Sequence, residues 1–326
     1  MNQNSSKVDP ELLSKLGPRA TYGQAILSAA ERFPNVVAAT ADLGSSSGLD
    51  RFSKKYPDRF INLGIAEQNM VGVAAGIARE GFTVFASSFA PFITMRAAEQ
   101  VRMNLGYMHN NVKLVGIGSG LSMGFLGNSH YGLEDLAIMR TVPGMRIICP
   151  SDGVEIFRTI EEACSYEGPM YIRLTGQPNN HVIYDSNSKF NFESVDTIRE
   201  GKEIAILSHG AVLGNVIGAA KILEDEGIKC SVYNFRIFKP SQREALEKIK
   251  DKYSKIVVVE EHSKIGGLGS VVGEFLSEFS HHPTLHQVSL PDDFGPTGSY
   301  DFLLTYYGLD VGSLVDKVRA IATSQQ

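Results

Sequence analysis

Short runs rich in valine, isoleucine and phenylalanine alternate with longer helical patterns along the first half of the chain. Apolar runs of strand length, bounded by turn-forming residues, predict buried strands. The expected strands are Val36–Asp42, Arg59–Leu63, Thr83–Ser87, Val112–Gly118, Met145–Cys149 and Met170–Leu174. Helical patterns lie between several of them, at Tyr22–Arg32, Ala66–Arg79 and Val154–Tyr166. Because strands that alternate with helices form parallel sheets covered on both faces, we predict an α/β unit.

A polar stretch rich in Asn, Ser and Asp, Gln177–Glu200, predicts a linker to a second, smaller α/β unit. The expected strands of that unit are Glu203–Ser208, Lys229–Phe235, Lys255–Glu260 and Thr284–Val288, with helices near Leu213–Glu226, Gln242–Lys250 and Ser270–Phe279. The two ends, Met1–Lys15 and Ser324–Gln326, are expected to be poorly ordered or to act as arms.

The bulk composition is that of an ordinary globular protein: 326 residues, of which 43% are hydrophobic and 21% charged. A net charge of −5 without a basic block gives no support for nucleic-acid binding. The N-terminus lacks the apolar stretch of a signal peptide or membrane anchor. The three cysteines are far apart and form no CxxC pair, which is typical of a reducing compartment. We therefore expect a cytoplasmic protein.

Several common sites are missing from the sequence. It contains no GxxxxGK[ST] phosphate loop, no dinucleotide-binding glycine pattern and no HExxH metal motif. Gly120–Gly124 matches GxSxG, but more glycines and polar residues follow where a hydrolase needs a helix, so we interpret the match as accidental. Isolated histidines are more often structural than catalytic, and this interpretation is applied to His109, His209, His281, His282 and His286.

The most informative segment runs from Asn62 to Ala78 and combines one acidic residue with a helix of glycines, alanines and valines. Small residues at this density let another backbone approach closely. Glu67 stands at the start of the helix, where a carboxylate is favoured by the helix dipole. Alternatively, Glu67 lies in an apolar interface, where desolvation disfavours its charge and allows it to share a proton with a ligand. The residues alone leave both interpretations open.

The string GIAEQNMVGVAAGIA, from Gly64 to Ala78, closely resembles the signature of the pyrimidine-binding domain in transketolases and related thiamine-diphosphate enzymes. The resemblance implies that Glu67 is catalytic and binds the cofactor. It would hydrogen-bond N1′ of the aminopyrimidine and promote the imino tautomer, whose 4′-nitrogen removes the proton from thiazolium C2. The cofactor then stores the carbanion.

A second motif of the same family is Phe85–Gln100. There the resemblance implies that Phe92 packs against the pyrimidine ring and that Phe89 lines the same pocket. On their own, both would be interpreted as core residues of a strand-to-helix corner. Arg96 and Gln100 also fit the family pattern, as structural or interface residues.

Matches continue over nearly the whole chain. The resemblance implies that Asp42 lies near the thiazolium, that Arg19 and Thr40 bind the substrate phosphate, and that catalytic His130 binds substrate oxygens and assists proton transfer. It divides the chain into an N-terminal arm (1–15), a pyrimidine-binding domain (16–178), a linker (179–200) and a transketolase C-terminal domain (201–326). The third-domain motifs Glu260-Glu261-His262, Gly266–Gly269 and Phe294–Gly298 are expected to be structural, His262 included.

The sequence departs from the family pattern in the substrate region. Leu126 replaces an aspartate that contacts a sugar hydroxyl, and Tyr131 replaces the glutamine after the histidine. Gly118 and Gly176 stand where the family has a histidine and an arginine for phosphate; Arg173 is a candidate substitute. Because a hydroxyl or phosphate is selected by such polar contacts, we expect a modified or less phosphorylated sugar as substrate.

A Mg²⁺-bound diphosphate needs oxygen ligands, which the family supplies through a GDG motif in its N-terminal domain. No GDG occurs here, and no metal ligand is assigned to this chain. We therefore expect thiamine diphosphate and Mg²⁺ to be bound together with a separate N-terminal subunit, in an α2β2 assembly.

Three functional hypotheses follow. The first is a transketolase-type subunit that transfers a two-carbon ketol unit from a ketose to an aldehyde. The second is a 2-oxoacid-using subunit, similar to deoxyxylulose-phosphate synthase or to the E1-beta chain of dehydrogenases. The third is a non-catalytic partner subunit, which intact Glu67, Phe92 and His130 disfavour.

Overall fold

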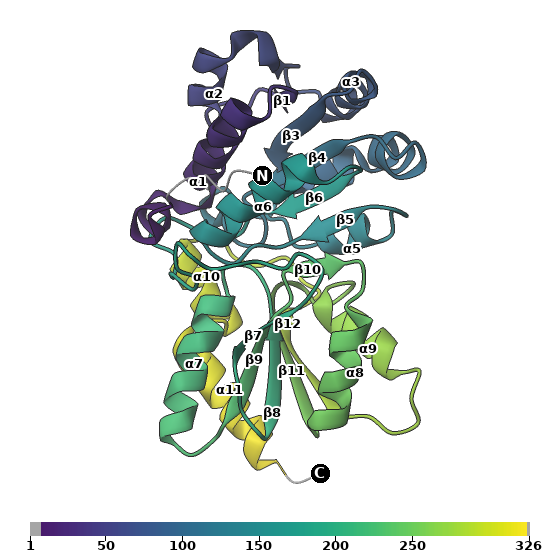
Figure 1. Ribbon diagram of the computed structural model, residues 1–326. Helices are drawn as coiled ribbons and strands as arrows, with labels where there is room; N and C mark the ends of the chain where they lie inside the picture. Colours follow the sequence, from purple (N-terminus) through teal and green to yellow (C-terminus); the bar gives the residue numbers. More distant parts are fainter. Residues whose placement is uncertain (1–7, 325–326) are drawn as a thin grey trace.

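The computed structural model describes residues 8–324, whose first half is built on a seven-stranded sheet (Figure 1). Its order is β10-β5-β6-β4-β3-β1-β2. The strands are β1 (Val36–Thr40), β2 (Phe60–Asn62), β3 (Thr83–Phe89), β4 (Val112–Ile117), β5 (Arg146–Ile148), β6 (Met170–Arg173) and β10 (Ile237–Lys239). All neighbours pair in parallel except β10, which is antiparallel to β5. Every side chain of β3 and β4 is buried, as continuous apolar runs in a covered parallel sheet require.

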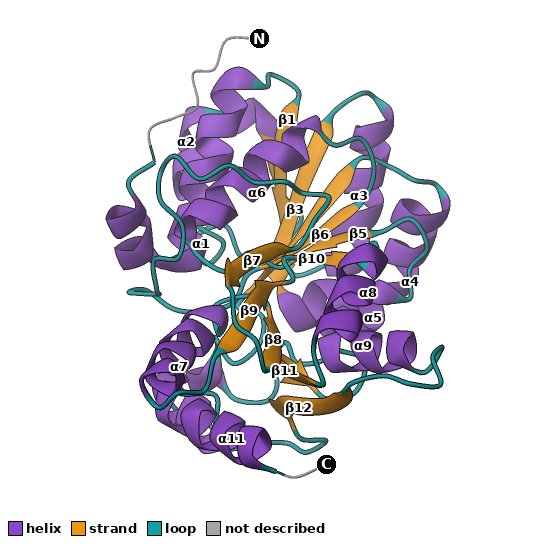
Figure 2. Cartoon of the chain, turned by 60° about the horizontal axis from the view of Figure 1, so that its bottom comes forward, coloured by secondary structure: helices purple, strands orange, loops and turns teal. Residues whose placement is uncertain are grey.

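Helices cover both faces of this sheet (Figure 2). One face packs on α1 (Pro10–Arg32) and α6 (Gly153–Ser165), and the other on α3 (Glu67–Arg79), α4 (Ala98–Gln100), α5 (Asp135–Arg140) and the π-helical turns η2 (Phe92–Arg96) and η3 (Val101–Tyr107). Peripheral elements are α2 (Asp50–Lys55), η1 (Pro57–Arg59) and η4 (Gly124–Leu126). Because successive side chains of a strand point to opposite faces, Ala38 packs on the face covered by α1 and α6, and Val37 packs on the face covered by α3.

The second unit has a five-stranded sheet of order β12-β11-β8-β9-β7. Its strands are β7 (Asp196–Arg199), β8 (Ile204–Ser208), β9 (Cys230–Asn234), β11 (Lys255–Ser263) and β12 (Thr284–Leu290). In Figure 1, α7 (Leu213–Asp225) and α11 (Val311–Thr323) cover one face, and α8 (Arg243–Lys252) and α9 (Leu268–Leu276) cover the other. Helix α10 (Tyr300–Tyr307) lies against η4 of the first unit. The predicted α/β fold of two units is thus confirmed.

The two units are joined by a shared strand. β10 follows β9 of the second sheet but pairs with β5 of the first, through Ile237 and Ile148. The amide of Cys149 also donates to the carbonyl of Arg236 at 2.7 Å. The sequence analysis did not predict this strand, because three residues give no recognisable period.

Several segments correct the sequence prediction. Residues 1–7 of the expected arm lie outside the described part, but the chain is helical from Pro10, because the Asp9 carboxylate accepts from the Glu11 and Leu12 amides and caps α1. The expected linker contains β7, which gains its partner only when β9 is folded beside it. Helices α10 and α11 were also missed. No helix in residues 8–324 has the length and apolar character needed to cross a membrane.

Candidate active site

The predicted site residues come from the carboxyl ends of neighbouring strands in the first sheet. Asp42 follows β1, Glu67 follows β2 as the first residue of α3, and Phe89 ends β3. Parallel α/β sheets bind ligands at this edge, because the strands end there and loops and helix N-termini converge.

The Glu67 carboxyl group is buried, with 1% of the residue exposed. Its Oε2 accepts a hydrogen bond from Arg96 Nη1 at 2.7 Å, and its Oε1 accepts one from the Ser88 hydroxyl at 3.2 Å. The Arg96 side chain remains 45% exposed. A buried acid is thus paired with a cation that reaches the surface.

Three rings form a cluster at this edge. Phe89, Phe92 and His130 contact one another edge to face, with ring centroids 5.2 to 5.9 Å apart. The Arg96 guanidinium lies 4.3 Å from the Phe92 ring centroid, so the same arginine contacts both the acid and the aromatic cluster. The segment from Phe92 to Arg96 is π-helical, a wide turn that occurs often at functional sites.

Asp42 occupies a turn just after β1, with φ of 59°, in the left-handed region. Its amide donates to Asn62 Oδ1 at 3.0 Å, and its Oδ1 accepts from Asn62 Nδ2 at 3.2 Å. Asn62, which the sequence analysis did not assign a role, therefore fixes an exposed carboxylate at the sheet edge.

A cleft of about 510 Å³ opens beside the aromatic cluster. Phe89 and Met123 line it, and Arg19 is the only charged residue on its wall in the described part of the chain. The family departures Gly118, Leu126 and Gly176 lie in this same cleft. Positions scattered over the sequence thus converge on one largely apolar pocket.

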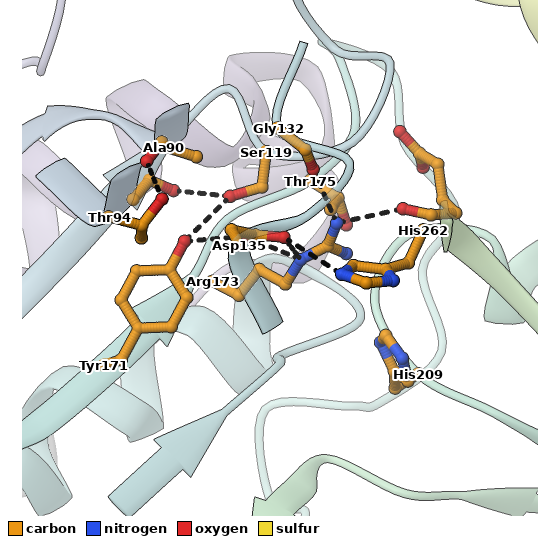
Figure 3. Close-up of polar contacts among 12 residues, drawn as sticks. Ala90, Thr94, Ser119, Gly132, Asp135, Tyr171, Arg173, Thr175, His209 and His262 are labelled. Atoms are coloured by element: carbon orange, nitrogen blue, oxygen red, sulfur yellow. Dashed lines mark hydrogen bonds and ion pairs between the residues drawn. The ribbon is translucent and has the colours of Figure 1, made fainter. Parts of the chain in front are cut away.

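Two candidate phosphate contacts do not lie in the cleft. Thr40 is fully buried, and its hydroxyl accepts from the Leu43 amide at 3.2 Å, which holds the turn after β1. Arg173 is 1% exposed and ion-paired with Asp135 (Figure 3). The expectation that Arg173 substitutes for a phosphate-binding arginine is therefore wrong, because its guanidinium is held inside the protein. Tyr131 is also buried, with its hydroxyl shared between the carbonyls of Gly124 and Pro296.

The residues present fit one end of thiamine diphosphate and not the other. A buried carboxyl group beside an aromatic cluster suits a flat ring with a protonated nitrogen. For the diphosphate end, residues 8–324 contain no group of three or more His, Cys, Asp or Glu side chains that could hold a metal ion. The described residues therefore supply the features of a pyrimidine site.

The sequence analysis assigned roles to Glu67, Phe89, Phe92 and His130, but it did not predict which groups hold Glu67 and Asp42. Ser88 and Arg96 bond to Glu67, and Asn62 bonds to Asp42. For Arg96, the signals were its fit to the family pattern and its place four residues after Phe92, about one helical turn away.

Comparison with known proteins agrees with this geometry. Residues 14–179 match the family model "Transketolase, pyrimidine binding domain", and residues 193–314 match "Transketolase, C-terminal domain". The 6-deoxy-6-sulfo-D-fructose transketolase subunit of Clostridium sp. strain MSTE9 is 36% identical, covering 91% of this chain and 92% of its own. A subunit of the apulose-4-phosphate transketolase of Phocaeicola vulgatus is 33% identical, covering 90% and 93%.

Among solved structures, a split-gene transketolase described as an inactive β4 tetramer superposes with a TM-score of 0.82 at 35% identity. The match covers 95% of this chain and 99% of that one. Both halves of the chain, its site and its relatives lead to one conclusion: this chain belongs to the transketolase family and corresponds to the C-terminal subunit of a split transketolase.

Proposed function

We propose that this chain is a subunit of a thiamine-diphosphate-dependent transketolase that transfers a two-carbon ketol unit from a ketose to an aldehyde. The observation that carries the proposal is the buried carboxyl group of Glu67 beside the Phe89–Phe92–His130 cluster at the sheet edge. When bound, thiamine diphosphate supplies the carbon centre that stabilises the carbanion of the transferred unit.

Each site residue has a distinct task in this proposal. Glu67 would hydrogen-bond N1′ of the pyrimidine from its buried position at the start of α3. Phe89 and Phe92 orient the ring and exclude water. His130 bonds to the Ser129 hydroxyl through Nδ1 at 2.9 Å, which leaves Nε2 for a substrate oxygen. Asp42, in the turn after β1, would lie near the thiazolium, and Arg19 would bind the far end of the substrate from the cleft wall.

A separate N-terminal subunit completes the site in this proposal. It brings the Mg²⁺ and diphosphate ligands, and two copies of each chain form an α2β2 enzyme, which we place in the cytoplasm. One support is that relatives are named as subunits. Another is the outer side of α3, which carries Gly72 and Gly76. A Cβ added to either glycine would have no atom of the described part of the chain within 4 Å. Such a surface lets a second backbone approach closely.

The substrate is proposed to be a modified or less phosphorylated sugar. A dianionic phosphate is usually bound by several cations and hydrogen-bond donors, whereas residues 8–324 place Arg19 as the single cation on this cleft. Two relatives carry names of unusual sugars, 6-deoxy-6-sulfo-D-fructose and apulose 4-phosphate, which supports a modified sugar, and the first of these has no phosphate.

The test is reconstitution of this chain with the N-terminal subunit, followed by two measurements. With thiamine diphosphate and Mg²⁺, the complex should exchange the C2 proton of the cofactor, and Glu67→Gln should slow this exchange at least about 100-fold, as expected for loss of a catalytic acid. Ketol transfer should be faster with 6-deoxy-6-sulfo-D-fructose or a deoxy-ketose as donor than with xylulose 5-phosphate.

Glu80→Gln is the matched control, since Glu80 is exposed at the far end of the same helix. Near-normal C2 exchange in Glu67→Gln would refute the role of the acid. Ordinary transketolase rates with xylulose 5-phosphate and ribose 5-phosphate would refute the substrate proposal. Release of carbon dioxide from pyruvate would instead identify a 2-oxoacid-using enzyme.

A further inference from the structure

The loop that carries His130 is closed at its base by a pair of glycines. The Gly120 amide donates to the Gly132 carbonyl at 2.8 Å, and the Gly132 amide donates back to the Gly120 carbonyl at 3.1 Å. We call Gly120 and Gly132 the loop neck. His130 lies two residues before Gly132, so the position of the neck determines where the imidazole meets Phe89 and Phe92.

Glu261, on β11 of the second unit, reaches across to this neck. Its side chain is buried, with Oε1 accepting from the Leu121 amide at 2.5 Å and Oε2 accepting from the Tyr300 hydroxyl at 2.6 Å. A Cβ on Gly120 would lie 2.2 Å from Oε1, and Gly120 has φ of +66°. Only glycine allows the carboxylate to approach so closely.

Arg173 holds the other side of the neck. Its Nη2 donates to the carbonyls of Gly132 at 3.0 Å and Glu261 at 2.9 Å, while Asp135 accepts from its Nε. Figure 3 shows Arg173 between Asp135 and the segment that carries His262. The neck and β11 are therefore tied together by a buried guanidinium.

The far end of the loop also rests on the second unit. Asn128 Nδ2 donates to the Gly295 carbonyl at 2.9 Å, and the Tyr131 hydroxyl donates to the Pro296 carbonyl at 2.6 Å. The Gly298 amide donates to the Gly124 carbonyl at 3.2 Å. The second unit thus contacts the His130 loop at both ends, whereas His130 itself faces the aromatic cluster of the first.

We propose that Glu261 is a positioning residue, through which the C-terminal domain fixes His130 over the candidate active site. The inference rests on the proposed function of His130 and assigns the C-terminal domain a part in catalysis. The physical basis is that a loop stays in one conformation only where its backbone donors are satisfied by a rigid support. Glu261 provides that support from a buried position near the end of β11.

The adjacent residue provides a matched control. Glu260 is equally buried on the same strand, but its oxygens accept from the Leu268 and Gly269 amides at the start of α9, at 2.7 and 3.0 Å. Glu261→Gln and Glu260→Gln make the same chemical change at neighbouring buried positions. Only the first contacts the His130 loop.

The first measurement is amide hydrogen exchange of the whole chain, together with the NMR signals of the His130 ring. In Glu261→Gln, exchange should rise at least about tenfold across residues 119–132 and the His130 signals should shift, because local opening becomes easier. Glu260→Gln should instead raise exchange at the start of α9. This readout needs no activity, so it stands even if the proposed reaction is wrong.

The second measurement is kcat of the reconstituted enzyme. Glu261→Gln should lower kcat about 10- to 100-fold, as small misplacements of catalytic groups do. In the double variant, Glu261→Gln should lower kcat little below the value for His130→Ala alone, because both changes remove the same contribution. Tyr300→Phe, which leaves the Glu261–Leu121 bond in place, should give a smaller loss and serves if Glu261→Gln does not fold.

The proposal is overturned if loop exchange in Glu261→Gln equals that of the unmodified chain. It is also overturned if the losses from Glu261→Gln and His130→Ala multiply, because Glu261 would then act independently of His130. Absence of ketol transfer in the unmodified complex would instead defeat the proposed function and leave the exchange result standing.

Discussion

At the residue scale, one arginine contacts both Glu67 and Phe92, the two residues proposed to bind the cofactor ring. Arg96 donates to Glu67 Oε2 and lies over the Phe92 ring, while Ser88 donates to Oε1. Both carboxyl oxygens are therefore engaged before any ligand arrives. A pyrimidine that bonds to Glu67 and packs on Phe92 has to displace the guanidinium, which is half exposed and free to move outward.

Arg96→Met should therefore strengthen binding of thiamine diphosphate to the reconstituted complex. A partly exposed ion pair contributes up to about 1 kcal/mol, so Kd should fall roughly two- to fivefold. Isothermal titration calorimetry measures this change. Arg102→Met, in the exposed part of η3, is the control and should leave Kd unchanged. A weaker affinity in Arg96→Met would mean that Arg96 holds the cofactor.

At the scale of elements, the two sides of α3 differ in character. Its inner side buries Met70, Val71 and Ala74 against the sheet. Its outer side keeps Gly72 and Gly76, although interior glycine costs a helix about 1 kcal/mol relative to alanine. Within residues 8–324, no contact requires these two side chains to be missing.

Gly76→Leu should separate folding from assembly. The free energy of unfolding should stay the same or rise by up to about 1 kcal/mol, because leucine is the better helix former. Association with the N-terminal subunit should be lost, because the side chain prevents close backbone approach. Chemical unfolding and light scattering measure the two effects. Lys221→Leu, exposed on α7, should leave association intact; normal assembly of Gly76→Leu would show that α3 is not in the interface.

At the scale of the whole molecule, the junction of the two units should make stability depend on pH. Burial raises the pKa of Glu261 to about 7, against the opposing effects of Tyr300 and Arg173. An acid whose folded pKa is raised binds its proton more tightly in the folded state. Its contribution is therefore fully present below the unfolded pKa of about 4.5 and is lost as the pH rises through 7.

The free energy of unfolding of the unmodified chain, taken relative to that of Glu261→Gln, should fall as the pH rises from 4.5 to 7.5. A pKa shift of this size corresponds to roughly 3 kcal/mol. Urea unfolding at several pH values measures the difference. Glu260→Gln should show no such slope between pH 4.5 and 7.5, because His209, His262 and the Gly269 amide outweigh burial and lower the pKa of Glu260, so its contribution is lost only below about pH 4.5. A pH-independent difference for Glu261→Gln would contradict the assigned pKa.

The sequence alone predicted the elements whose pattern is local. The buried runs at β3 and β4 are apolar throughout most of their length, and the periodicity of α6 and α7 is contained in consecutive residues. The family signature around Glu67 is also contiguous, so the acid, its helix and the neighbouring phenylalanines could be found without coordinates.

Only the tertiary structure decided which distant residues meet. β10 is three residues long and pairs with β5, in the sheet of the other unit. The strand β7, in the expected linker, forms by pairing with β9. Burial against Asp135 removes Arg173 from the substrate cleft, and the Glu261 carboxyl group accepts a hydrogen bond from the Leu121 amide near the His130 loop. Secondary structure follows from neighbours along the chain, whereas burial and hydrogen-bond partners depend on which strands lie side by side.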